Sequence, residues 1–176
     1  ILFTAGNQSI SFRAAAASDT SRIWIQREEK AIPVAKMESV RFRNLLAQPA
    51  NYIILSHREL EKSSRQYPNP IKTYASHRSS PIGGGFDTLV VRVEDLYNQF
   101  SFGEKSSLGI YEFLKAYYPV HKPTHLLLAG RSLAIFSTGR IGGVTYYYRN
   151  NQTAFSFQDL IPPGGYPFSD NVYALN

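Results

Sequence analysis

Aspartates beside predicted strand ends are the residues of this chain whose type and position best suit chemistry. Asp95 follows an apolar, β-branched run, and Asp170 lies in the segment FSDNVYAL. Ligands of open parallel sheets collect at the carboxyl edge of the strands, which makes Asp95 a candidate for a cleft or for calcium binding. Asp170 is a second candidate, although a turn aspartate bonded to its own backbone is the common alternative. Structural calcium therefore stays open as a cofactor, and no other cofactor is expected.

The pair Gly130–Arg131 comes directly after the apolar run HLLLA, where backbone amides can approach an anion. It is therefore a candidate for a cleft or for anion binding. The surrounding sequence AGRSLAIFSTGRIGG matches neither a phosphate-binding P-loop nor a dinucleotide fingerprint. The earlier glycines 83–85 leave a predicted helix to enter a strand, and this order predicts a helix C-cap and link instead of a phosphate site.

Residues for nucleophilic catalysis or for a transition-metal site are scarce. No cysteine is present, which excludes thiolate zinc sites, disulfides and a cysteine nucleophile within these residues. A serine elbow G-x-S-x-G is also absent. Among the four histidines only His121 and His125 have the i, i+4 spacing of a helical metal site, and Pro123 lies between them. Surface or core positions are the interpretation that we favour for all four.

The composition indicates one globular domain with a core, at 176 residues, 43% hydrophobic and 18% charged. The formal charge is +6, but the basic residues are scattered among carboxylates, so no nucleic-acid partner is expected. No run of about 18 apolar residues exists, which predicts no membrane span. The first residues show neither an initiator Met nor the pattern of a signal peptide, which indicates a mature or excised protein.

Three apolar runs separated by helical stretches determine the expected fold. Residues 52–55, 89–93 and 125–130 are typical of strands buried in a sheet. Their alternation with helices predicts an α/β class, a parallel sheet flanked by helices, over residues 44–176. Residues 1–43 contain short alternating stretches such as SISFRA and SRIWIQ, and we expect a β-rich N-terminal flank that ends a preceding segment.

Finer expectations concern the ends of the elements. Ser56 is expected to cap a helix, and Pro119 to end the long helix that begins at SSLG. Tyr97, Phe100 and Phe102 are expected to pack the junction between the second strand and that helix, as scaffold. Towards the C-terminus, GVTYYYR and TAFSFQ are expected to pair as a β-hairpin, and SDNVYAL to begin a further strand.

Several of these segments, in this order, resemble the gingipain-type cysteine peptidases of Bacteroidetes. NLLAQPANYIILSH resembles the family's first strand, and VEDLYNQFSFGEKSSLGIYEFLKAYY resembles its strand-to-helix segment, in which Tyr97–Gly103 is the most specific part. PTHLLLAG resembles the strand that follows, and DLIPPGGYPFSDNVYAL the proline-containing loop and the segment beyond it. The resemblance covers residues 44–175 and departs from the family at Gly130–Arg131, where glycine–aspartate is usual.

This resemblance implies the N-terminal subdomain of a caspase-like α/β/α unit, from a bacterial protein that is secreted or lies at the outer surface or in the periplasm. The family's catalytic histidine and cysteine lie in its second subdomain, so no residue here is assigned to catalysis. The chain is thus expected to be the noncatalytic part of a cysteine endopeptidase, inactive alone. Its expected partners are the C-terminal catalytic subdomain and, in the parent, protein substrates.

Two alternatives stay open. One is a catalytically inactive relative that acts as a cell-surface binding module or as an assembly module of type IX secretion. The other is an independent anion-binding α/β domain that uses Gly130–Arg131.

Overall fold

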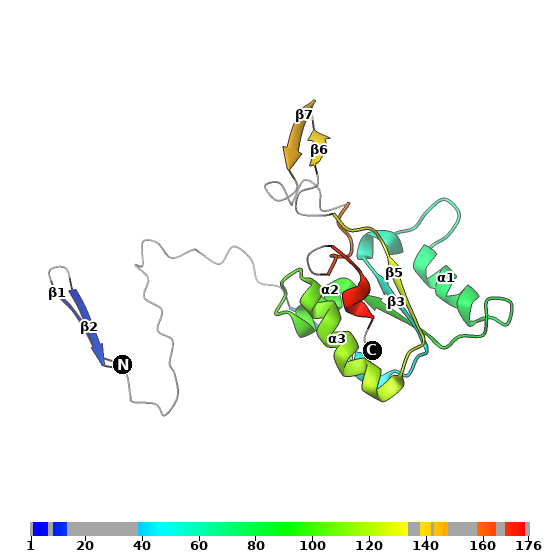
Figure 1. Ribbon diagram of the computed structural model, residues 1–176, viewed down its shortest axis with the longest axis horizontal. Helices are drawn as coiled ribbons and strands as arrows, with labels where there is room; N and C mark the ends of the chain where they lie inside the picture. Colours follow the sequence, from blue (N-terminus) through cyan, green and yellow to red (C-terminus); the bar gives the residue numbers. More distant parts are fainter. Residues whose placement is uncertain are drawn as a thin grey trace. The chain divides into compact units, whose positions relative to one another are not determined.

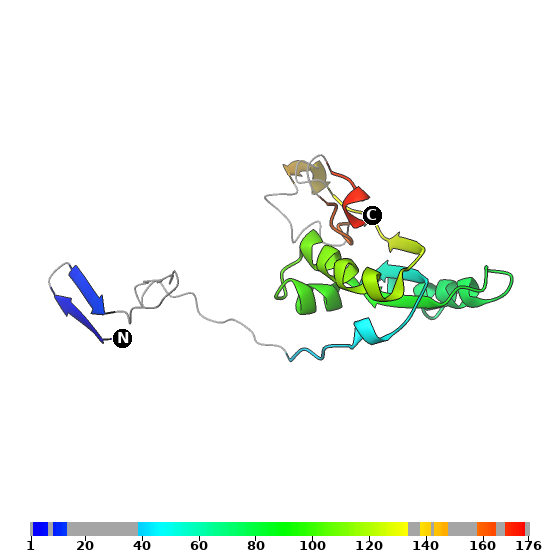
Figure 2. The same ribbon diagram turned by 60° about the horizontal axis from the view of Figure 1, so that its bottom comes forward.

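The computed structural model describes residues 2–6, 9–13, 39–133, 138–141, 143–147, 158–164 and 168–174. The chain divides into two compact units, Ile1–Ser39 and Val40–Asn176. In the first unit, β1 (Leu2–Gly6) and β2 (Ser9–Arg13) pair antiparallel, as Figure 2 shows. The strand expected in SISFRA is therefore confirmed. A β-rich flank over residues 1–43 stays a prediction, and SRIWIQ lies outside the described residues.

The second unit contains a three-stranded parallel sheet in the order β4-β3-β5. β3 (Tyr52–Ser56) is the central strand, and β4 (Thr88–Arg92) and β5 (His125–Ala129) pair with it on either side. Every residue of β3 is buried, because a strand covers each of its edges and helices cover both faces of the sheet. The α/β class and the parallel sheet expected from the three apolar runs are confirmed.

Three α-helices connect these strands. α1 (Pro70–Ser79) follows β3, whereas α2 (Val93–Phe100) and α3 (Ser107–His121) lie between β4 and β5 in the chain. Figure 1 shows α1 on one side of the strands and α2 and α3 on the other. The first connection runs outward from β3 to β4, and the second returns across β3 to β5. Two connections in opposite directions place their helices on opposite faces of the sheet, because parallel crossovers are right-handed.

Side-chain caps determine where the helices begin. The Asn69 side-chain oxygen accepts a hydrogen bond from the Lys72 N–H at 2.9 Å, and Pro70 occupies the first helical position, where no N–H is needed. The Ser106 hydroxyl accepts from the Leu108 N–H at 3.1 Å and caps α3. Of the two serines in the SSLG segment, the first is therefore the cap.

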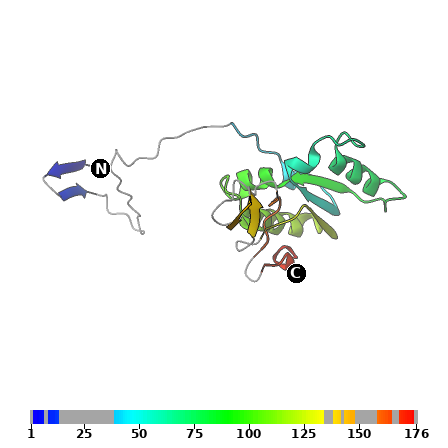
Figure 3. The same ribbon diagram turned by 90° about the horizontal axis from the view of Figure 1, so that it is seen from above.

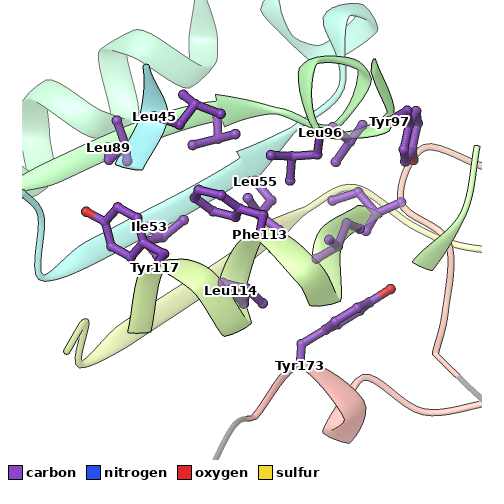
Figure 4. Close-up of a cluster of buried hydrophobic side chains, with 14 of the residues drawn as sticks. Leu45, Ile53, Leu55, Leu89, Leu96, Tyr97, Phe113, Leu114, Tyr117 and Tyr173 are labelled. Atoms are coloured by element: carbon purple, nitrogen blue, oxygen red, sulfur yellow. The ribbon is translucent and has the colours of Figure 1, made fainter. Parts of the chain in front are cut away.

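The larger hydrophobic cluster lies between the sheet and helices α2 and α3. Figure 4 shows Phe113 and Leu114 of α3 among the side chains of Ile53, Leu55 and Leu96. Phe113 is fully buried, and truncation of such a core aromatic to alanine costs about 3–5 kcal/mol. The opposite face of the sheet packs against α1 through a smaller cluster of Tyr52, Ile54, Ile71 and Ala75.

Short elements complete the second unit. β6 (Thr138–Ile141) and β7 (Val144–Tyr147) form an antiparallel hairpin. The 3-10 helices of this unit that the structure describes are η2 (Leu45–Ala47), η3 (Arg58–Glu61) and η5 (Asn171–Tyr173). η5 lies beside α3, as Figure 3 shows. No helix of the described residues is long and apolar enough to cross a membrane.

Two expectations about helix ends are wrong. After β3 the chain forms the 3-10 helix η3, which His57 caps instead of Ser56, because the His57 side chain reaches the Glu59 N–H while the Ser56 side chain is buried. α3 continues through Pro119 to His121 and ends at Lys122, which adopts a left-handed conformation with φ of 48°. Pro119 removes one helical N–H donor, and the packing of Phe113 and Tyr117 against the core holds the helix in spite of that loss.

The junction after β4 also differs from expectation. Helix α2 begins directly after the strand, and Tyr97 and Phe100 pack as expected, since Tyr97 is buried and Phe100 contacts the core cluster. Phe102 is fully exposed at a positive φ of 57°, so its expected packing role is wrong. The turn between α2 and α3 directs this side chain away from the core.

The C-terminal region differs in two further respects. β7, which lies in GVTYYYR, pairs with β6 on its N-terminal side, because Gly143 at a φ of 83° allows a tight turn between them. Most of TAFSFQ lies outside the described residues. SDNVYAL contains η5 instead of a strand, and the Tyr173 hydroxyl donates to the Pro162 carbonyl at 2.6 Å. That bond and the burial of Tyr173 hold this segment as a compact turn.

Candidate functional site

The carboxyl edge of the parallel sheet is the place where this fold offers a site. β3 ends at Ser56 and β5 at Ala129. These two strands are neighbours in the sheet, and the connection from β3 to β4 runs in the opposite direction to the connection from β4 to β5. In open α/β sheets a crevice for ligands forms beyond the strands where the winding direction changes. The residues that follow the three strands are therefore the first to consider.

A histidine and a glutamate meet at this edge. His57, directly after β3, has its Nε2 atom 3.1 Å from Oε1 of Glu94, which lies in the first turn of α2 after β4. The same Oε1 accepts from the Arg58 Nε at 2.9 Å and from the Arg58 backbone N–H at 3.2 Å. His57 Nδ1 accepts from the Glu59 N–H at 3.2 Å, which assigns the ring proton to Nε2 in the neutral form.

This cluster joins two strand ends and leaves the imidazole without a free nitrogen. Nδ1 accepts from the backbone, and Nε2 donates to Glu94. In this arrangement His57 therefore positions Glu94 and η3.

Sequence reasoning missed His57 and Glu94 as members of a cluster. A usable signal was present, because each residue stands within two positions of the end of a predicted parallel strand. Residues at those positions converge on one edge of the sheet. The sequence interpretation applied this rule to Asp95 and to Gly130–Arg131 only.

Asp95 lies one residue further along α2 and forms a different contact. Its Oδ2 atom is 3.5 Å from the Arg43 guanidinium, and the carboxylate is partly exposed. Nearby, Arg92 holds Glu61 with two bonds of 2.9 and 2.7 Å. The Arg92 hydrogen bonds lower the pKa of Glu61 below its ordinary value of 4.5. Asp95 thus lies beside the outer edge of β4 and not with His57 in one group.

Gly130 and Arg131 contact a segment from later in the chain. The Arg131 carbonyl accepts hydrogen bonds from the N–H groups of Leu160 and Ile161 at 2.9 and 3.2 Å, and its guanidinium donates to the backbone carbonyl and side chain of Gln158. Gly130 has a φ of 146°, and a Cβ there would lie 3.0 Å from the Leu160 Cβ. The pair binds this segment tightly, whereas a role in a cleft or in anion binding stays a prediction.

The same segment carries a buried aspartate. Asp159 is almost fully buried, its Oδ2 lies 2.6 Å from the Lys105 Nζ, and its Oδ1 accepts from the Leu133 N–H at 3.0 Å. These bonds attach the segment to the α2–α3 turn and to the chain after β5. A buried carboxylate that is paired and hydrogen-bonded in this way is a structural group.

Asp170 lies apart from the carboxyl edge. It precedes η5, and its backbone carbonyl accepts from the Tyr173 N–H at 3.0 Å, but its side chain forms no capping hydrogen bond to the backbone, so the turn role considered for the side chain is not seen. Asp170 and Tyr173 line a cavity of about 340 Å³ beside β5. Burial raises the pKa of Tyr173 well above its ordinary value of 10.0, and the nearby Asp170 carboxylate contributes.

The histidines with metal-site spacing do not form a metal site. The His121 Nε2 lies 2.8 Å from the Leu46 carbonyl, while the His125 ring stacks on Tyr52 at 5.3 Å between ring centres. Within the described ranges no group of three or more His, Asp or Glu side chains is placed to hold a metal ion. The candidate carboxylates Asp95 and Asp170 therefore belong to no such group in that part of the chain.

Comparison with known proteins agrees with this geometry. No curated protein and no solved structure matches the chain. A family model described as "Peptidase family C25" matches residues 45–176, which contain the parallel sheet and all three α-helices. The match confirms the resemblance to gingipain-type peptidases, which rested on the strand and helix segments of the same region. The chain therefore belongs to peptidase family C25, and it contains no cysteine.

Proposed function

We propose that this chain is the noncatalytic N-terminal α/β subdomain of a secreted gingipain-like cysteine endopeptidase, in which it supplies one wall of the substrate cleft. The family match and the absence of cysteine support this proposal. In the parent protein a thiolate attacks the peptide carbonyl and a histidine acts as the base, both from a following subdomain. Secretion, the caspase-like arrangement and a preceding β-rich domain belong to the same proposal.

The observation that carries the proposal is the outer edge of β5. Among the described strands, β5 pairs with β3 only. The His125 N–H donates to the Asn51 carbonyl, on the side of β3. Backbone groups alternate along a strand, so the N–H and C=O groups of Leu126 and Leu128 point to the other side. A further strand of the following subdomain would pair there and extend the sheet.

The cavity next to this edge supports docking at the same place. Its volume is about 340 Å³, and Ile53, Leu114, Leu126 and Leu128 give it a mainly apolar lining. The exposed aromatic side chain of Tyr118 stands at its margin. An apolar hollow beside an unpaired strand is suited to receive a packed subdomain, because both the backbone and the side chains there gain partners.

Amide hydrogen exchange tests the proposal at single residues. In this chain alone we expect the Leu126 and Leu128 amides to exchange fast and the Leu127 amide, which faces β3, to exchange slowly. In the native polypeptide isolated from its source, all three amides should be protected. That polypeptide should also hydrolyse peptides and lose the activity on thiol alkylation, while this chain hydrolyses none.

The alternative is a catalytically inactive relative that acts as a cell-surface binding or secretion-assembly module. A native polypeptide that protects the β5 edge but has no alkylation-sensitive activity would favour it. Leu126 and Leu128 amides that still exchange fast in an active native enzyme would overturn docking at β5.

A further inference from the structure

The opposite edge of the sheet has a different chemical character, and it is independent of the proposed function. β4 is the other edge strand, and within the described part it pairs with β3 alone. The Asp87 carbonyl, just before β4, accepts from the Tyr52 N–H on the side of β3. The Val90 carbonyl instead lies 3.4 Å from an Arg43 guanidinium nitrogen on the outer side. The backbone groups of Thr88, Val90 and Arg92 therefore point outward.

A hollow extends along this outer edge, and we call it the β4 trough. It consists of a cavity of about 500 Å³ between β4 and the segment around Arg41 and Arg43, and of a second cavity of about 490 Å³ between β4 and α1. Lys72 and Thr88 line both cavities, so the two cavities lie next to each other along β4. An extended peptide placed here could pair with the outward backbone groups of β4.

The charge of the trough is positive. Arg41, Arg43, Lys72 and Arg92 line the larger cavity together with only two carboxylates, so four positive charges against two negative leave a net charge of +2. The carboxylates are engaged, because Glu61 pairs with Arg92 and Asp95 lies near Arg43. Among the described residues, Arg41 and Lys72 form no ion pair.

The positive side chains stand on both sides of the sheet plane. Lys72 belongs to α1, which covers one face, and the second cavity adds the hydroxyl groups of Ser76 and Ser79 there. Arg43 contacts Asp95 of α2, which covers the other face. Because side chains of an added strand alternate between the two faces, acidic residues at neighbouring positions would meet cations on each.

We propose that the β4 trough is a docking site for an extended acidic peptide segment of a partner protein, which adds to β4 as a further strand. Main-chain hydrogen bonds to Thr88, Val90 and Arg92 supply the pairing, and the long Arg43–Val90 contact gives way to a peptide N–H. Carboxylates of the added strand bind Lys72 on the α1 side of the sheet and Arg43 on the α2 side, and Arg41, which lines the same cavity, adds a third cation. Strand addition with alternating side chains for specificity is an established mode of peptide recognition.

The test measures binding of a short, fluorescein-labelled peptide of Glu-Glu-Thr repeats to the full chain by fluorescence anisotropy. We expect saturable binding that weakens with salt. R41E and K72E should each weaken it by about tenfold or more, which corresponds to about 1.4 kcal/mol. K115E is the matched control, because Lys115 is an exposed cation on α3, away from β4, and binding should not change.

Backbone methylation separates strand addition from a purely electrostatic contact. One peptide carries N-methyl groups on every amide, and a second carries them on alternate amides only. A strand added to β4 needs one free alternate set of amides, so the fully methylated peptide should lose binding while the alternately methylated peptide keeps it.

Three outcomes overturn the proposal. Equal binding of both methylated peptides leaves only charge attraction. No binding of the unmethylated peptide would mean that the cations only prevent the β4 edge from pairing with other chains. A dimer in analytical ultracentrifugation that K72E dissociates would identify a second copy of this chain as the occupant.

Discussion

At the scale of single residues, Gly130 shows how one backbone position connects the strand β5 to a distant segment. Its φ of 146° is a conformation that glycine adopts and that other residues avoid. The space for a side chain is also missing, since Leu160 and Ile161 lie against it. Both constraints require glycine after β5, whatever residue follows it.

We therefore expect Gly130→Ala to destabilise the second unit by about 2–3 kcal/mol, through backbone strain and crowding against Leu160. Gly85→Ala is the matched control, because Gly85 has a φ of 64° with nothing near its missing Cβ. The control should cost only about 1 kcal/mol, the strain of a left-handed residue. Urea unfolding of the two variants measures the difference, and equal losses would contradict the contact with Leu160.

The Glu61–Arg92 pair gives the stability of the protein a dependence on acid. The pKa of Glu61 is lower in the folded than in the unfolded state. Glu61 therefore stabilises the fold at pH values above its ordinary pKa of 4.5, and this contribution is lost as the pH falls through the pKa of the folded state. Glu61→Gln should therefore cost about 1 kcal/mol at pH 7 and almost nothing at pH 2. Urea unfolding of both proteins at the two pH values checks this, and a constant difference would contradict it.

At the scale of elements, the capping serine of α3 can be distinguished from its neighbour. Ser106 accepts a hydrogen bond from the Leu108 N–H, while Ser107 is the first residue of the helix. Ser106→Ala should lower the free energy of unfolding by about 1 kcal/mol, because a helix N–H loses its partner. Ser107→Ala should change it by less than about 0.5 kcal/mol. Thermal unfolding of the two variants measures both losses of stability. A larger loss for Ser107→Ala than for Ser106→Ala would assign the cap to Ser107.

Much of the element order could be predicted from the sequence, because buried strands and helix caps have local signals. The apolar runs at 52–55 and 89–93 identified two strands within one residue of their ends. α2 was missed although Val93, Leu96, Tyr97 and Phe100 have helical spacing. The β-branched run before it extends the expected strand to Val93, and the polar residues Glu94, Asp95 and Asn98 obscure the helical pattern.

The errors near the C-terminus have a physical cause of another kind. η5 replaces the expected strand because Tyr173 is buried against the rest of the unit and bonds to Pro162. The contact of Arg131 with Gln158 likewise joins positions far apart in the chain. Such tertiary contacts have no local pattern, and for that reason the candidate site was predicted only as far as the strand ends.

At the scale of the whole molecule, the division into two units leads to a prediction about the chain without its first part. The sheet, its helices and both hydrophobic clusters belong to residues 40–176. A unit with its own core is expected to fold alone. Deletion of residues 1–39 should leave its unfolding free energy within about 0.5 kcal/mol of that of the full chain. Calorimetry of both proteins tests this, and a lost or shifted transition would contradict it.

The central place of β3 has a consequence for the protein during its synthesis. Its partner in the register Tyr52↔His125 is made 73 residues later, whereas every residue of β3 is buried in the finished fold. At about 5–20 residues per second, the ribosome needs roughly 4–15 seconds to reach β5. For that interval the apolar strand β3 lacks one neighbour on the nascent chain, so a chaperone that shields it would raise the yield of folded protein more than one that acts after release.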